Sequence, residues 1–323
     1  MNNHLKKIVL EATGAEELFE IQKIQDLWSG YGAIMRYGLL GSSMESVIVK
    51  HVRLPQNGSH PRGWNTDISH ERKIKSYEVE MAWYRNWSAH CDENSYVPVC
   101  LALDFYDNER LIVLEDLICS GFEETRTVVS LEEIKLCVQW LAHFHATYLG
   151  QSADHLWENG TYWHLDTRPD ELEALKDLPL KRAAKQIDQK LRNSPFQTFV
   201  HGDAKLANFC FSRNGQRVAA VDFQYVGKGC GMKDLAYFIG SCLQEEECER
   251  LEGELLDHYF SVLQKSLKVK NNFLDGFALE RDWRSLFPVA WADFHRFIKG
   301  WSADHWKINS YSERIAREVV ASL

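Results

Sequence analysis

The sequence predicts a two-lobed α+β fold, with a small N-terminal lobe made of an antiparallel sheet and one helix and a larger, mainly helical C-terminal lobe. Runs rich in β-branched and aromatic residues recur in residues 20–54 and 99–114. Beyond residue 117, apolar residues recur instead at intervals of three and four. The length of 323 residues suits two units of roughly 150 residues each. We therefore expect one lobe over residues 1–117 and a second over residues 118–323.

The first lobe is predicted to hold five strands and one helix. Segments rich in Gly and Ser, SGYG and GSSME, separate the first three strand-like runs and favour an antiparallel meander. The Pro- and Gly-rich residues 55–64 are expected to form a loop. Apolar residues from Ile74 to Tyr84 recur at helical spacing and predict a helix over about 69–88. The strands are expected at residues 21–28, 33–40, 46–54, 99–105 and 110–114.

Helices dominate the second lobe. Ser130 and Glu133 form a capping-box signature, in which each side chain accepts the backbone N–H of the other residue. The signature precedes apolar residues at helical spacing as far as Tyr148. Three later segments show the same pattern, at residues 234–243, 251–262 and 283–301.

Charge and composition exclude several classes of protein. The chain carries 37 Lys and Arg against 46 Asp and Glu, a net charge of −9, without the basic stripe that nucleic-acid binding needs. This acidity favours a cationic or neutral small substrate, or one carried with a metal ion. No apolar run approaches the ~18 residues of a membrane span or a signal-peptide core, so we expect a cytoplasmic protein without membrane contact. The eight cysteines contain no CxxC pair, which argues against zinc or a disulfide framework.

The segment HGDAKLAN at 201–208 is the sharpest chemical signal. Its spacing places Asp203 five residues before Asn208, as in the catalytic loop of phosphoryl-transfer enzymes. Asp222, at the end of the apolar run VAAVDFQ, offers a second carboxylate for a metal that bridges phosphates. Two other interpretations are open. Gly, Asp and Asn also populate ordinary turns, and His201 with Asp203 could bind a hydrolytic metal, although no third ligand stands at short spacing.

These motifs resemble those of the aminoglycoside phosphotransferase and choline kinase-like superfamily, small-molecule kinases with a protein-kinase-like fold. The His-Gly-Asp loop followed by VDFQ is most similar to the choline-kinase-like and ecdysteroid-kinase-like branch. The motif order matches over about residues 20–300 and is strongest at 201–234. The resemblance implies an N-terminal nucleotide-binding lobe, a C-terminal catalytic and acceptor-binding lobe, and the cofactors ATP and Mg²⁺.

The resemblance also assigns roles within the second lobe. It makes Asp203 the catalytic base, Asn208 and Asp222 the metal ligands, and His201 a structural anchor of the loop. Lys205 stands where protein kinases carry a lysine that stabilises the transferring phosphoryl group, although it could equally be an exposed lysine. Gln224 stands where protein kinases have Gly. Asp234 resembles a buried Asp that braces the catalytic loop, with a helix N-cap as the alternative, and His145 is expected to pack beneath that loop.

The N-terminal lobe contains the expected partners for a nucleotide. Lys50, on the third strand, has the position from which a kinase lysine reaches the α- and β-phosphates, and Glu80 on the helix could pair with it. Gly30 and Gly32 would let backbone N–H groups approach phosphate oxygens, although a hairpin turn would look the same. Backbone groups near Glu115 and Leu117, in LEDL, resemble a hinge that binds adenine.

Acceptor recognition is expected in the helical lobe, where aromatic side chains accompany Asp293 and His295. Aromatic faces near carboxylates could bind an amine by cation–π attraction. The helical spacing of Trp291, Phe294 and Trp301, however, favours packing in the core. The tryptophans of this lobe that we considered are Trp157, Trp163, Trp283, Trp291, Trp301 and Trp306.

The sequence therefore predicts an enzyme that moves the γ-phosphoryl group of ATP to a hydroxyl of a small molecule, such as an amino-alcohol, aminoglycoside, sugar or sterol-like compound. Two alternatives remain. A protein kinase would need an activation loop, for which the short interval from Asp222 to Asp234 leaves little room. A nucleotide-binding scaffold without turnover would not need Lys50, Asp203, Asn208 and Asp222 together. The sequence does not identify the acceptor or the oligomeric state.

Overall fold

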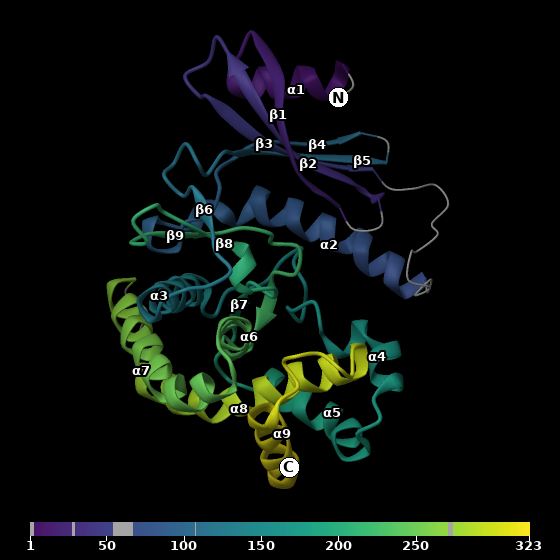
Figure 1. Cartoon of the computed structure of the whole chain (residues 1–323), viewed down its shortest axis with the longest axis vertical. Coiled ribbons are helices and arrows are strands. Elements are labelled where there is room, and N and C mark those ends of the chain that lie inside the picture. The colour runs from purple at the N-terminus through teal and green to yellow at the C-terminus, as the bar shows by residue number, and fades with distance from the viewer. Residues whose placement is uncertain (1–2, 28–29, 54–66, 107, 271–273) are drawn as a thin grey trace.

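The computed structural model describes residues 3–27, 30–53, 67–106, 108–270 and 274–323. The N-terminal residues form a sheet above a larger, helical part of the molecule (Figure 1). The fold is therefore α+β, with an antiparallel sheet first and mostly helices after it, which confirms the predicted fold class.

Five antiparallel strands make up the sheet, in the order β1-β2-β3-β5-β4. The first three are neighbours in both sequence and space, as the predicted meander requires, and β5 then pairs with β3. Each strand overlaps its predicted range, whereas the predicted loop at 55–64 lies outside the described residues. The strands are β1 (Glu17–Asp26), β2 (Gly32–Leu40), β3 (Ser46–Arg53), β4 (Cys100–Tyr106) and β5 (Glu109–Glu115).

Two helices pack against the sheet, α1 (Asn3–Thr13) and α2 (Asp67–Asn86). Leu5 and Val9 of α1 are buried in one apolar cluster with residues of β3 and β5. The sequence did not predict α1, because its buried apolar residues are few. The predicted helix over 69–88 corresponds to α2, which lies between the sheet and the helical part (Figure 1).

The helical part begins at the predicted capping box. Ser130 N–H donates to Glu133 Oε2 (2.8 Å) and Glu133 N–H donates to Ser130 Oγ (3.3 Å), which fixes the start of α3. The other predicted helices are also present, whereas α4, α5 and α9 were not predicted. The helices are α3 (Leu131–Tyr148), α4 (Pro169–Ala174), α5 (Leu178–Arg192), α6 (Met232–Cys242), α7 (Glu245–Val269), α8 (Gly276–Trp301) and α9 (Ser310–Ser322).

Short strands lie where the sheet-containing and helical parts meet. They form a three-stranded group, β6-β8-β9, and the pair β7-β10. Their bounds are β6 (Glu124–Thr125), β7 (Thr198–Val200), β8 (Phe209–Phe211), β9 (Val218–Ala220) and β10 (Gly227–Gly229). The 3₁₀ turns are Ser88–His90, Glu93–Ser95, Leu165–Thr167 and Leu206–Asn208.

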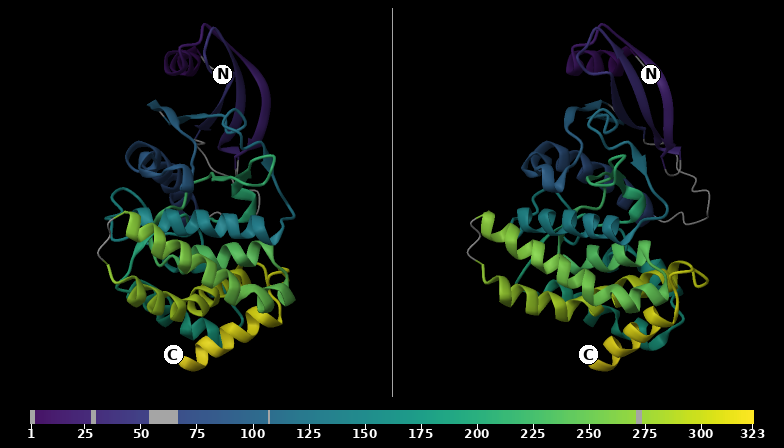
Figure 2. Two further views of the ribbon diagram at one scale, coloured as in Figure 1. Left: turned by 90° about the vertical axis from the view of Figure 1, so that its left-hand side faces the viewer. Right: turned by 60° about the vertical axis from the view of Figure 1, so that its left-hand side comes forward.

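The core of the helical part is continuous with the sheet. α3 packs against α7, and α8 packs against α5, α6 and α9, so that the helices are stacked in layers (Figure 2). The same apolar cluster includes Val79 and Trp83 of α2 and Ile112 and Leu114 of β5. The two parts therefore hold each other in a defined orientation. None of the helices among the described residues combines the length and apolarity that crossing a bilayer requires.

Candidate active site

Lys50 reaches the site because side chains alternate along β3. Val47 and Val49 lie in the apolar cluster with α1, whereas Lys50 and Val52 face the other side of the sheet, toward α2. Lys50 Nζ donates to Glu80 Oε2 at 2.6 Å. Both side chains are almost fully buried, with 4% of Lys50 and 2% of Glu80 exposed. Charged groups are buried in this way only when they are paired.

The charge of Lys50 is secured by its neighbours. Its Nζ also lies 3.6 Å from Asp222 Oδ1, so two carboxylates face one ammonium group. Burial lowers the pKa of Lys50, but the carboxylates of Glu80 and Asp222 outweigh burial and hold this pKa above its ordinary value. A permanent cation therefore lies beside Asp222.

The loop from His201 to Asn208 is held from below by Asp234. This fully buried carboxylate accepts the N–H groups of His201 (2.5 Å) and Gly202 (2.9 Å). Asp234 is the third residue of α6, whose N-cap is Gly231, so it is the predicted brace and not an N-cap. Gly202 has a φ of 80°, and a Cβ there would lie 2.1 Å from Tyr225 O, which explains the glycine in the motif.

A chain of buried polar groups continues from the brace into the helices. His145 of α3 contacts Asp234 Oδ2 through Nε2 (3.1 Å) and Tyr259 of α7 through Nδ1 (2.7 Å). His145 is fully buried. The structure thus places His145 beneath the loop, as predicted. Three helices therefore contribute to the position of one loop.

Asp203 is the centre of the loop and is 6% exposed. Its Oδ2 accepts Lys205 Nζ (2.8 Å) and Asn208 Nδ2 (3.1 Å), and its Oδ1 accepts the Tyr237 hydroxyl (3.1 Å). Burial raises the pKa of Asp203, and the ammonium of Lys205 offsets this only in part. A buried carboxylate with a raised pKa that is fixed by three donors is well suited to accept a proton from a hydroxyl.

Asp222 lies next to these groups, two residues beyond β9. Its φ is 70°, a left-handed conformation that costs a non-glycine residue free energy and that clusters at functional sites. Gln224 Nε2 donates to Asp222 Oδ1 at 2.7 Å. Burial raises the pKa of Asp222, but the cationic groups around it, with Lys50 the strongest, outweigh burial and hold this pKa below its ordinary value.

The donor set fits a magnesium ion. Asn208 Nδ2 donates to the backbone oxygen of Asp203 (2.8 Å), an acceptor only, so the amide orientation is fixed and its Oδ1 is turned away from Asp203. Asp222 supplies an ionised carboxylate. Mg²⁺ binds to one or two such oxygen ligands, with phosphate oxygens and water completing its coordination. No group of three or more His, Cys, Asp or Glu side chains that could hold a metal occurs among the described residues.

Gly30 lies between β1 and β2, and Gly32 is the first residue of β2. Gly30 N–H donates to Leu27 O (3.2 Å) and has a φ of 74°. A Cβ on Gly32 would lie 2.0 Å from His51 O, so the close approach of β3 requires glycine there. This local geometry by itself accounts for both glycines, and their contact with phosphate stays a prediction.

The segment from Glu115 to Leu117 connects β5 to the helical part. Glu115 N–H donates to Val99 O at 2.9 Å and is therefore not free for an adenine ring. Asp116, which the sequence did not single out, accepts Arg36 Nε (2.6 Å) and Ser46 Oγ (2.7 Å). These contacts attach the connection to β2 and β3.

Two further groups near the site were missed from the sequence. Tyr237 on α6 bonds the predicted base, and Lys73 on α2 donates to Gln224 Oε1 at 2.8 Å. Tyr237 follows Asp234 by three residues, so helical spacing could have indicated that it faces the loop. Lys73 carried no such signal, because only the fold brings α2 next to Gln224.

The tryptophans of the helical part are divided between core and surface. Trp163 is fully buried and donates to Asp293 Oδ2 (3.0 Å), and Trp291 is also buried. Trp301 and Trp306 are 40% and 50% exposed. The packing predicted from the helical spacing holds for Trp291 and Phe294, whereas Trp301, on the same stripe, is exposed.

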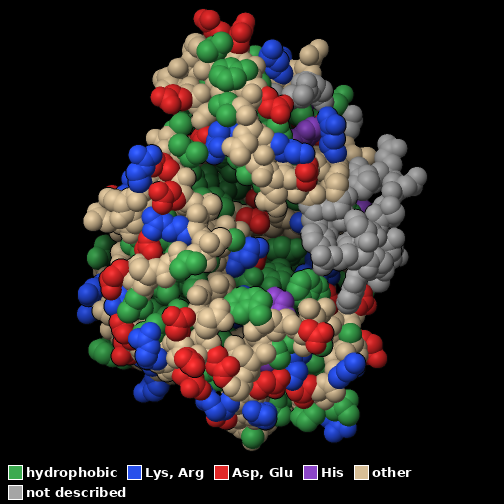
Figure 3. All heavy atoms as spheres, viewed as in Figure 1, with side chains coloured by type: hydrophobic (Ala, Val, Ile, Leu, Met, Phe, Trp, Pro, Cys, Tyr) green, Lys and Arg blue, Asp and Glu red, His purple; other side chains and the backbone are tan. Residues whose placement is uncertain are grey.

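The site lies where the surface of the molecule is hollowed between the sheet and the helices, with acidic and basic side chains inside the hollow (Figure 3). One ammonium group from the sheet thus faces a loop with a buried carboxylate, an amide and a second carboxylate. Together with the order of the elements, this arrangement defines a protein of the kinase-like class. A family model described as ecdysteroid kinase-like matches residues 40–150 and 149–272. The chain therefore belongs to the ecdysteroid kinase-like family, as the motifs predicted.

One solved structure shows the same fold, and others are similar at lower scores. A microcompartment-associated aminopropanol kinase superposes with a TM-score of 0.53 at 15% identity, over 99% of this chain and 94% of that one. A choline kinase from Streptococcus pneumoniae gives 0.45 at 13% identity, over 99% and 100% of the two chains. An aminoglycoside phosphotransferase from Streptomyces rimosus, in complex with ADP and streptomycin, gives 0.45 at 14%, over 80% and 90%. No curated protein matches the sequence.

Proposed function

We propose that this protein is an ATP- and Mg²⁺-dependent phosphotransferase that moves the γ-phosphoryl group to a hydroxyl of a small molecule. The observation that carries the proposal is the meeting of Lys50 and Glu80 with Asp222, which lies more than a hundred residues further along the chain. Membership of the ecdysteroid kinase-like family and a fold shared with an aminopropanol kinase support it.

The residues divide the task between the two lobes, for which we propose the boundary at residue 117. Lys50, held by Glu80, binds the α- and β-phosphates. The connection at Glu115 and Leu117 lies against the adenine ring without using the Glu115 N–H, which is bonded to Val99 O. Asn208 and Asp222 hold Mg²⁺, which neutralises phosphate charge when bound. Gly30 and Gly32 lie beside the phosphates in this arrangement.

Asp203 acts on the acceptor. It takes the proton of the acceptor hydroxyl as the oxygen forms a bond to the γ-phosphorus and the bond from that phosphorus to the leaving oxygen of ADP breaks. Lys205, whose Nζ is 2.8 Å from Asp203 Oδ2, stabilises the charge of the transferring group.

A protein acceptor is less well supported. The residues between Asp222 and α6 are folded, since β10 pairs with β7 and seven of the nine residues 223–231 are buried, with only Lys228 exposed. This part of the chain therefore contains no long activation loop on which a peptide could be held.

The experiment is to measure ADP release by purified protein with MgATP and a panel of alcohols that includes choline, ethanolamine, aminoglycosides, sugars and sterols. Asp203→Asn is expected to lower kcat by about 10²–10⁴-fold and to leave the affinity for MgATP unchanged. Glu246→Gln, which removes an exposed carboxylate of α7, is the matched control. An unchanged kcat in Asp203→Asn would refute the assigned base. Bound ATP that no acceptor consumes would favour a scaffold.

A further inference from the structure

An aromatic cluster beside Asp203 already contains a positive charge. Lys307 Nζ lies 4.7 Å from the ring centre of Tyr237, 5.3 Å from that of Phe294 and 5.5 Å from that of Trp306. The rings of Tyr237 and Phe294 are themselves in edge contact, with centroids 4.8 Å apart. Three aromatic groups around one ammonium form the arrangement with which proteins bind organic cations.

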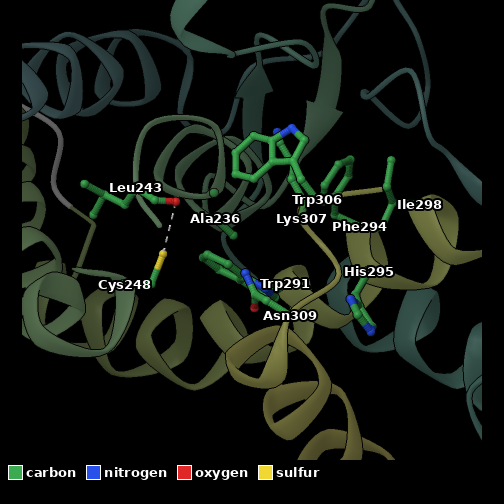
Figure 4. Close-up of a pocket in the computed structure, with 11 residues that line it drawn as sticks. Ala236, Leu243, Cys248, Trp291, Phe294, His295, Ile298, Trp306, Lys307 and Asn309 are labelled. Carbon is green, nitrogen blue, oxygen red and sulfur yellow. Dashed lines mark hydrogen bonds between the residues drawn. The ribbon is translucent and has the colours of Figure 1, made fainter. Parts of the chain in front are cut away.

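The same lysine lines a pocket of the helical part. Trp306 and Lys307 come from the segment between α8 and α9 and line the pocket together with residues of α6 and α8, with Phe294 of α8 next to Lys307 (Figure 4). The lining is otherwise mostly apolar. It consists of Ala236, Gly240, Leu243, Cys248, Trp291, Phe294, His295, Ile298, Trp306, Lys307 and Asn309.

Tyr237 connects this cluster to the proposed base. Its ring contacts Lys307 and its hydroxyl donates to Asp203 Oδ1 at 3.1 Å. A molecule that presents a hydroxyl to Asp203 from this side therefore meets the Lys307 ammonium. Lys205, with its side chain 40% exposed, adds a second ammonium next to Asp203.

The Lys307 ammonium has no carboxylate partner among the described residues, because its contacts there are with rings. Burial lowers the pKa of Lys307 to about 8, and the charges of Cys242 and Asp203 counteract this only in part. The group is still mainly protonated at pH 7. The cation is thus held by the aromatic faces themselves.

We propose that Lys307 determines acceptor specificity by occupying the aromatic cluster with its own ammonium, so that the site accepts uncharged or anionic alcohols and rejects cationic ones. This inference rests on the proposed phosphotransferase function and deepens it. At a separation of about 6 Å and an effective dielectric constant near 20, the repulsion between a cationic acceptor and the Lys307 ammonium weakens binding by about 100-fold.

The test is binding of two probes of the same shape, choline and its uncharged carbon isostere 3,3-dimethylbutan-1-ol. Binding is followed through the indole N–H signals of ¹⁵N-labelled tryptophan, with Trp306→Phe to assign the signal of Trp306. The wild-type protein is expected to bind the isostere about 100-fold more tightly than choline. Lys307→Met should reduce this preference to less than about fivefold or reverse it.

Two further variants keep the test decisive. Lys307→Arg retains the charge on the rings and should retain the preference of the wild type. Lys185→Met removes an exposed lysine of α5 and should also leave the preference unchanged. Equal binding of both probes to the wild-type protein, or binding of neither probe to the wild type and Lys307→Met, would overturn the proposal. Because the readout is binding, this failure is distinct from an absence of ADP release, which would overturn the phosphotransferase function instead.

Discussion

The amide of Gln224 holds the Asp222 carboxylate, and its removal is expected to weaken Mg²⁺ binding. Gln224 Nε2 donates to Asp222 Oδ1 at 2.7 Å, while Gln224 Oε1 accepts Lys73 Nζ (2.8 Å) and Ser76 Oγ (3.2 Å). Gln224 is 5% exposed, so water does not readily replace these contacts. The left-handed backbone of Asp222 needs such support to persist.

The size of the effect follows from the bond that is lost. A hydrogen bond to an ionised group contributes about 1.5–3 kcal/mol, which corresponds to roughly a 10- to 100-fold change in an equilibrium constant. Gln224→Met retains the length of the side chain but neither donates nor accepts at these positions. We therefore expect the Mg²⁺ concentration for half-maximal ADP release to rise by about 10- to 100-fold at saturating ATP.

A matched variant separates this effect from a general loosening of α2. Ser76→Ala removes a hydroxyl that contacts the same amide but leaves the bond from Gln224 to Asp222 in place. Its Mg²⁺ requirement should stay within about threefold of the wild type. A folded Gln224→Met protein with an unchanged Mg²⁺ requirement would refute the reasoning, because Asp222 would then not depend on Gln224.

Two other outcomes concern stability. Asp234→Asn keeps the shape of the side chain but turns an NH₂ group toward one of the two N–H groups of His201 and Gly202. The free energy of unfolding, measured in urea, should therefore fall by about 3–5 kcal/mol. A loss under 1 kcal/mol would contradict the bracing role. Burial, reinforced by Lys233, lowers the pKa of His164 to about 3, below the ~6.5 of an unfolded chain. Between these two pKa values the unfolded state binds a proton that the folded state does not. From pH 5.5 to 4 the free energy of unfolding of the wild type should therefore fall by about 1.4 kcal/mol per pH unit more than that of His164→Gln. Parallel pH profiles of the two proteins would show that His164 does not cause this loss.

Much of the fold was predictable because its signals are local. The strands of the sheet, α2 and the capping box of α3 are all encoded in spacing within a few residues. α5 was missed although Asp177 caps it and its buried residues, such as Ile187 and Leu191, follow helical spacing. The cap and the spacing together are enough to predict α5 from the sequence.

The candidate site was predictable where its residues lie close together in the sequence or on a strand that can be counted. The spacing from Asp203 to Asn208 lies within one loop, and Lys50 could be placed by counting strands. The roles of Gln224 and Lys307 could not be found in this way. Gln224 contacts residues of α2, and Lys307, from the segment between α8 and α9, contacts rings of α6 and α8, so only the packed structure brings the partners together.

The polar chain from Tyr259 through His145 to Asp234 has a consequence for heat tolerance. The geometry of the loop from His201 to Asn208 thus depends on how α3, α6 and α7 pack together, and no described residue of the five-stranded sheet takes part in this chain. If the proposed function holds, warming that lets these three helices move relative to one another would therefore abolish phosphoryl transfer before the strands of the sheet lose their structure.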